Sequence, residues 1–177
     1  LDSVELGSGM QLAMWENNQD RVNVCSNHHT LSMYIHGGYQ SYQKTPQGWH
    51  NGGGPDRICL MPQDYESTWD LRDPLTFVHL YYTEQHLKRV AEQVWDKEPS
   101  QIILNPQIFV ADPQISMIYR HFLLNAEWSE KIAPRAMAYH SRQILLLRSE
   151  QEYHLDAVLK RKEKQGEQPI AFSNEDI

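Results

Sequence analysis

Three short extended runs, separated by turn signals, fill residues 52–82 and constrain the fold more than any other stretch. The first, residues 58–61, is wholly apolar and stops at Pro62. The second, residues 67–71, mixes polar and apolar side chains. The third, residues 75–82, is rich in aromatic and branched residues, which suit a pleated, half-buried surface. Strands this short, with turns this regular, predict a β-sandwich or a β-barrel.

Periods of two predict further strands ahead of this stretch, at residues 10–15, 22–24, 30–36 and 39–44. The alternation is clearest at 30–36, where Tyr34 and His36 lie opposite the apolar face. Either side chain could line a cavity or face solvent, and solvent is favoured for His36. Gly37 and Gly38 separate the last two runs, which predicts a hairpin with a glycine-rich turn.

Helical spacing dominates the second half of the chain. Thr83 suits an N-cap, and the apolar residues after it predict a helix over residues 84–95. A short apolar run at 102–104 predicts one more strand, and Asp112 followed by proline predicts a second helix start. Pro134 opens a longer helix that is apolar on more than one face, so it must be buried from more than one side.

Strands first and helices after predict an α+β fold with a small β-barrel leading. We divide the chain into a barrel with one intervening helix at residues 1–110, a helical dimerisation segment at 111–165, and a loose tail at 166–177.

Composition narrows the class of protein. The net charge is −7, whereas a free-standing nucleic-acid binder is usually basic. The two cysteines, Cys25 and Cys59, are too few for a disulfide framework and are expected to be reduced thiols. The sequence shows no signal-peptide pattern and no apolar run of transmembrane length, so we expect a cytoplasmic protein without a membrane partner.

Several stretches, taken in order, resemble the N-terminal sensor domains of AraC-type transcription regulators. They are residues 29–38 (HTLSMYIHGG), 58–62 (ICLMP), 77–82 (FVHLYY) and the helix at 87–92. The resemblance covers about residues 10–150. It implies a cupin-like barrel, or double-stranded β-helix, that binds a small effector, with helices beside it that form a homodimer. It also implies that DNA is bound only through a separate C-terminal domain with two helix-turn-helix motifs, which this sequence does not contain.

The turn after residue 61 also resembles the second motif of the cupins, but it lacks the metal ligand. Catalytic cupins read Pro-x-Gly-x-x-His there, and this chain has Asp64 in place of glycine and Ser67 in place of histidine. His28 and His29 are adjacent, so a regular strand would point them to opposite faces. We therefore expect no metal, no cofactor and no enzymatic activity. The alternative is a small cupin-like enzyme acting on a carbohydrate or an aromatic acid.

The candidate ligand-binding residues follow from the alternation of the 75–82 run. One face of this strand carries Phe77, His79 and Tyr81, which combine aromatic walls with a donor or acceptor. Trp69 and Tyr34 complete the expected lining. His79 is either a polar anchor for an effector or a buried histidine satisfied by its neighbours. The expected effector is a small polar molecule with an apolar face, such as a sugar or an aromatic acid.

The candidate dimer interface lies on the helix over residues 134–150. A two-fold interface presents the same apolar patch twice, which is a common way to bury one. The same patch could instead pack between the barrel and its own helices. The residues expected at the interface are Met137, Ile144, Leu146 and Leu147.

Overall fold

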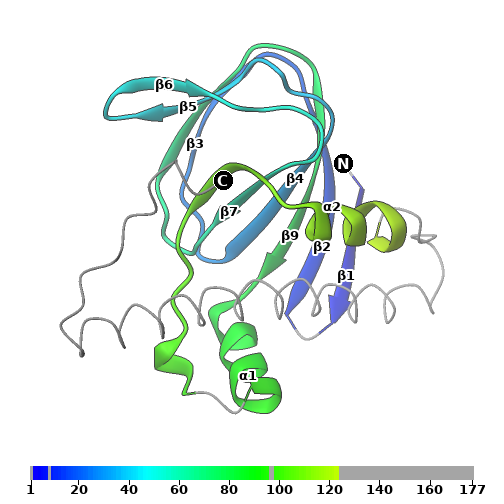
Figure 1. Cartoon of the computed structure of the whole chain (residues 1–177), viewed down its shortest axis with the longest axis vertical. Helices are drawn as coiled ribbons and strands as arrows, with labels where there is room; N and C mark the ends of the chain where they lie inside the picture. The colour runs from blue at the N-terminus through cyan, green and yellow to red at the C-terminus, as the bar shows by residue number, and fades with distance from the viewer. Residues whose placement is uncertain (1, 8, 96–97, 124–177) are drawn as a thin grey trace, which may run out of the picture.

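The computed structural model describes residues 2–7, 9–95 and 98–123, which form two antiparallel sheets with short helices beside them (Figure 1). The larger sheet has the order β1-β2-β9-β4-β7-β10, and the smaller has the order β3-β8-β5-β6. The strands are β1 (Asp2–Gly7), β2 (Met10–Asn17), β3 (Asp20–Val24), β4 (His29–Gly37), β5 (Ser41–Thr45), β6 (Gly48–Asn51), β7 (Arg57–Met61), β8 (Ser67–Leu71), β9 (Leu75–Tyr82) and β10 (Gln107–Ala111).

The two sheets curl around a common interior but share no hydrogen-bonded ladder within the described residues. The architecture is therefore an antiparallel β-sandwich and not the closed barrel that we expected. The strands predicted around residues 58–61, 67–71 and 75–82 are confirmed as β7, β8 and β9.

The predicted hairpin at Gly37 and Gly38 is wrong, because β4 and β5 belong to different sheets. Both glycines have a positive φ, 68° and 76°, so the chain turns a corner from one sheet into the other. The corner packs on the chain at Pro74. A Cβ at Gly37 would lie 2.1 Å from the Pro74 carbonyl oxygen, and the Gly38 N–H donates to that oxygen.

The strand predicted at residues 102–104 is also wrong. These residues have no regular structure, and Ile103 is 69% exposed. The strand is β10, a few residues later, which pairs with the edge of β7. The β10 register shifts between Gln107 and Val110, so the pattern around Phe109 does not alternate simply.

The helices occupy positions set by their capping residues. Helix α1 (Glu84–Trp95) begins where predicted, with the Thr83 hydroxyl accepting the His86 N–H at 3.1 Å. Helix α2 (Pro113–Ile118) begins after Asp112, whose carboxylate accepts two N–H groups of the first turn. A short 3₁₀ turn, η1 (Pro99–Gln101), precedes β10, and a π-helical turn, η2 (Tyr119–Leu123), follows α2.

The main core lies between the larger sheet and α2. Val78, Leu80 and Tyr82 of β9 are buried there with Ile115 and Ile118 of α2. These β9 residues lie on the face of the 75–82 run opposite the candidate ligand-binding residues. The alternation in the sequence therefore identified the core-facing side of this strand correctly. No helix in the described part of the chain is long and apolar enough to cross a membrane.

The predicted dimer interface lies outside the described residues. It comprises Met137, Ile144, Leu146 and Leu147 on the helix expected over residues 134–150.

Candidate functional site

A cavity of about 350 Å³ opens between the two sheets. Alternate residues of β2, β3, β4, β8 and β9 line it, together with Cys59 and Met61 of β7. The volume falls in the range of small-molecule sites, roughly 300–1,000 Å³, and such sites are mostly apolar with a few placed polar groups. This cavity is therefore the candidate site.

All five residues predicted to bind a ligand line this cavity. They are Tyr34, Trp69, Phe77, His79 and Tyr81. Their convergence follows from the pairing of β4 with β9, which sets Tyr34 directly opposite Phe77, and from the second sheet, which brings Trp69 across the interior. Binding by these residues remains a prediction. His36, for which solvent was favoured, is exposed.

A chain of three polar side chains runs along one wall of the cavity. The indole N–H of Trp15 donates to the hydroxyl oxygen of Tyr81 at 2.9 Å, and that oxygen lies 2.9 Å from Nδ1 of His79. Burial, with a smaller contribution from the neighbouring His28, lowers the pKa of His79 to about 3, so the imidazole is neutral. The ring of Phe77 lies 4.8 Å from that of His79. Sequence reasoning missed Trp15, because only the β2–β9 register places it opposite Phe77.

Phe109 is a buried residue of β10 that packs against two residues of the cavity wall. Its ring packs edge-on against Trp69, with centroids 5.6 Å apart, and also contacts Tyr34. Its φ is +56°, a conformation that a bulky residue rarely adopts. The Phe109 N–H donates to Sγ of Cys59 at 3.4 Å, which helps to hold this conformation. Sequence reasoning missed Phe109, since nothing local marks the irregular register of β10.

Three lining residues have polar groups whose hydrogen bonds or pKa values limit their chemistry. The indole N–H of Trp69 donates to the Ser67 hydroxyl at 2.9 Å, so it is already engaged. Burial raises the pKa of the Cys59 thiol to about 12, which keeps the sulfur protonated and poorly nucleophilic. Burial also raises the pKa of Tyr34 above its ordinary value.

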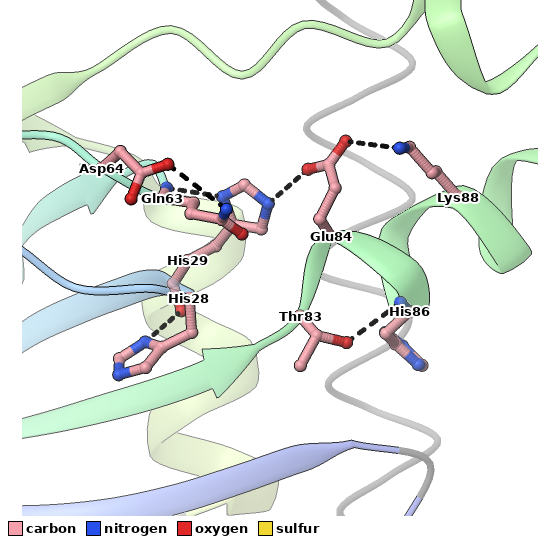
Figure 2. Close-up of polar contacts among 8 residues, drawn as sticks. All are labelled: His28, His29, Gln63, Asp64, Thr83, Glu84, His86 and Lys88. Carbon is pink, nitrogen blue, oxygen red and sulfur yellow. Dashed lines mark hydrogen bonds and ion pairs between the residues drawn. The ribbon is translucent and has the colours of Figure 1, made fainter.

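The adjacent histidines take opposite sides of the sheet, as the alternation predicts. His28 lines the cavity, with its ring edge-on to Tyr81 at 4.8 Å. Figure 2 shows His29 on the other side, where its Nδ1 accepts the Gln63 N–H at 2.9 Å and its Nε2 lies 2.7 Å from a Glu84 carboxylate oxygen. Because Nδ1 is an acceptor, Nε2 carries the proton and donates a hydrogen bond to the Glu84 carboxylate. His29 thus ties the start of α1 to the turn after β7.

The turn that resembles the cupin motif has polar residues where the motif has glycine and histidine. Asp64, which replaces the glycine, has a φ of +61°, a left-handed conformation that aspartate tolerates better than most residues. Ser67, which replaces the histidine, accepts the Trp69 indole N–H. Among residues 2–7, 9–95 and 98–123, no three His, Cys, Asp or Glu side chains gather to hold a metal ion.

Several solved structures are similar to this chain over part of its length, at low sequence identity. The AraC-like transcriptional activator CuxR is 9% identical, with a TM-score of 0.51 over 81% of this chain and 54% of CuxR. The EutQ protein of Clostridium difficile is 12% identical, with a TM-score of 0.36 over 42% of this chain and 56% of EutQ. A cupin superfamily protein from Desulfitobacterium hafniense is 9% identical, with a TM-score of 0.38 over 46% of this chain and 75% of that protein.

The chain thus spans about half the length of CuxR and of EutQ. The match to CuxR shows a common fold. The sequence itself matches no protein-family model and no curated protein.

Proposed function

We propose that this chain is the effector-binding and dimerisation domain of an AraC-type transcription regulator. The observation that carries the proposal is the cavity of about 350 Å³ between the two sheets, with aromatic walls and a few polar groups. The shared fold with CuxR, an AraC-like activator, supports the same class.

The chemistry of the described cavity residues favours binding over catalysis. The Cys59 thiol stays protonated because burial raises its pKa to about 12. His79 is neutral, and its Nδ1 is engaged with the Tyr81 hydroxyl. Outside the cavity, both ring nitrogens of His29 are engaged in protein contacts. A nucleophile beside a free general base is the pattern that a hydrolytic or transfer enzyme requires, and these residues do not form it.

Dimerisation is proposed from the sequence alone. The apolar helix over residues 134–150 supplies the surface, with Met137, Ile144, Leu146 and Leu147 at the interface. In this proposal, DNA is contacted only through a separate helix-turn-helix domain of the parent protein.

A fusion reporter tests the proposal directly. The chain is joined to a DNA-binding domain that represses its reporter only as a dimer. Repression is expected from the fusion, and an effector found by thermal-shift screening should change it. Leu146→Asp should abolish repression, whereas Lys44→Ala, at an exposed position of β5, should not. A folded fusion that never represses, with or without a bound small molecule, contradicts the proposed function.

A further inference from the structure

The lining of the cavity carries no formal charge among the described residues. None of those residues is Lys, Arg, Asp or Glu. The strand alternation explains this pattern in the smaller sheet. Arg21 and Asp70 form an ion pair at 3.1 Å, while their sequence neighbours Val22 and Trp69 line the cavity. The Arg21–Asp70 pair thus lies on the outer face of this sheet, and Asp20, at the exposed start of β3, is not among the lining residues.

We infer that the cavity takes an uncharged aromatic molecule carrying a hydrogen-bond acceptor, and that it rejects carboxylates. The inference rests on the proposed effector-binding function of the same cavity, and it narrows the class of effector. The sequence predicted a sugar or an aromatic acid. The inference retains an aromatic ring in the effector but excludes a carboxylate group, and it excludes sugars.

Above the ordinary titration range of histidine, a carboxylate would lose its water in this cavity without gaining a cation. Burying an unpaired charge is far more costly than burying a neutral group of the same shape. His79 cannot supply the missing cation, because burial holds its pKa near 3. An amide or a ketone in the same place needs only a hydrogen-bond donor.

The polar chain of the cavity wall supplies that donor. An indole nitrogen can only donate, so the Tyr81 oxygen accepts from Trp15 at 2.9 Å. Accepting from Trp15 strengthens the Tyr81 hydroxyl as a donor, and the inference assigns its hydrogen to Nδ1 of the neutral His79, 2.9 Å away. With the hydrogen bonds in this direction, the proton of the neutral His79 ring lies on Nε2. No hydrogen-bond partner of Nε2 is present among the described residues. Ser32, which pairs directly across from His79 and also lines the cavity, adds a hydroxyl beside it.

The rest of the lining suits a flat apolar body and not a sugar. A sugar presents hydroxyls on every side, and each buried hydroxyl requires a partner. Here the indole N–H groups of Trp15 and Trp69 are already engaged within the protein. An apolar cavity of roughly 150 Å³ holds benzene. A volume of about 350 Å³ therefore suits a substituted or two-ring aromatic molecule.

Matched pairs of neutral and anionic probes test the inference by calorimetric titration of the purified chain. The pairs are benzamide with benzoate, cinnamamide with cinnamate, and indole-3-acetamide with indole-3-acetate, and D-glucose is the sugar probe. The titrations are made at about pH 7.5, above the ordinary titration range of histidine. At least one amide should bind, and it should bind at least about tenfold more tightly than its carboxylate.

Three variants locate the interaction. His79→Phe keeps an aromatic ring but removes the Nε2 donor, and it should weaken amide binding by about tenfold. Val24→Lys, at the half-buried end of β3 on the cavity wall, should raise carboxylate affinity. Thr68→Ala lies on the outer face of β8, where its hydroxyl donates to Asn23, and should change neither affinity.

Each outcome separates this inference from the proposed function. A carboxylate that binds as tightly as its amide, or glucose binding where the amides do not, overturns the inference and leaves effector binding standing. Unchanged amide affinity in His79→Phe overturns the assignment of the donor. The absence of binding by every probe contradicts the inference itself, while repression by the fusion reporter still tests the regulator proposal independently.

Discussion

His79 combines a polar ring with an environment that keeps it neutral. It lines the cavity, and Tyr81 occupies its Nδ1. The sequence left open whether it is a ligand anchor or a satisfied histidine. The structure gives it a partner on one nitrogen and a place on the cavity wall for the rest of the ring, so the two descriptions are compatible.

The lowered pKa of His79 predicts how stability depends on pH. The ordinary pKa of 6.5 falls to about 3 on folding, so the unfolded chain binds a proton that the folded chain does not. This contribution to stability is complete above about pH 6.5 and is lost as the pH falls towards 3. The free energy of unfolding should fall by up to about 1.4 kcal/mol per pH unit in that window.

Urea unfolding of the wild type and His79→Phe at a series of pH values measures this contribution. The free energy of unfolding of the wild type, relative to that of His79→Phe, should fall as the pH falls below 6.5. Subtracting the variant removes the titration of the remaining histidines and carboxylates. Parallel pH profiles would refute the prediction.

The positive φ of Phe109 predicts that alanine loses its usual stability advantage over glycine at this position. Phe109→Ala should destabilise by about 3–5 kcal/mol, because the ring packed on Trp69 is lost. Glycine in a strand usually costs about 0.5–1 kcal/mol more than alanine, but glycine tolerates a positive φ without strain. With φ at +56°, Phe109→Gly should be no less stable than Phe109→Ala.

Phe77 provides the matched control for this ranking. It also sits in a strand, but it is not among the positive-φ positions. Denaturant unfolding should therefore show the usual order there, with Phe77→Gly less stable than Phe77→Ala. The same order at both sites would contradict the role of the Phe109 backbone.

At the scale of single residues, the sequence revealed the parts of the cavity that depend on alternation. Phe77, His79 and Tyr81 share a face because the strand has a period of two. The positions of Trp15 and Phe109 could not be predicted from the sequence. The first depends on the register between two distant strands, and the second on an irregular register that allows a positive φ.

At the scale of elements, helix α1 is fixed to the sheet by one polar contact as well as by its apolar face. Its first residue, Glu84, accepts a hydrogen bond from the buried His29. Lys88, one turn later, lies 3.7 Å from the other carboxylate oxygen. Leu87 and Val90 of the same helix are buried.

Glu84→Ala should therefore cost about 1–3 kcal/mol, because it leaves the buried Nε2–H of His29 without its acceptor. Glu92→Ala, at an exposed position of the same helix, is the control and should change stability by less than about 0.5 kcal/mol. Chemical unfolding monitored by circular dichroism gives both values. Equal effects of the two substitutions would show that the His29 contact adds nothing to stability.

Secondary-structure elements could be predicted where their signals are local in the sequence. They were missed where pairing with a distant strand determines whether a segment forms a strand or a turn. Helix α1 follows from a cap and helical spacing within one stretch. The strand expected at residues 102–104 has the right composition but no partner, whereas β10 has the edge of β7. The two glycines after β4 look like a hairpin turn, and only the packing on Pro74 shows that they form a corner.

At the scale of the whole molecule, the assembly remains a prediction. The purified chain should be a homodimer by light scattering. Leu146→Asp or Leu147→Asp should yield a monomer or an aggregate, since a charge in a two-fold apolar interface is buried twice. A wild-type chain that stays monomeric at high concentration would remove the dimer from the proposed function.

The chain alone should bind duplex DNA only weakly. A net charge of −7 opposes the phosphate backbone, which supplies most non-specific affinity. Fluorescence anisotropy with a labelled duplex at physiological salt measures this affinity. Tight, sequence-specific binding would mean that the chain carries its own DNA-binding surface.

The two sheets are joined by side chains and loops across the interior, and no ladder of hydrogen bonds joins them within the described residues. The wall residues that lie in strands point their side chains out of the sheet, so a non-proline substitution there leaves the hydrogen-bonding groups of the ladder in place. The framework and the recognition surface are separable in this chain. A few substitutions on the inner face can therefore change which ligands such a fold binds. The hydrogen-bonded ladders and the face packed against α2, which stabilise the fold, stay unchanged.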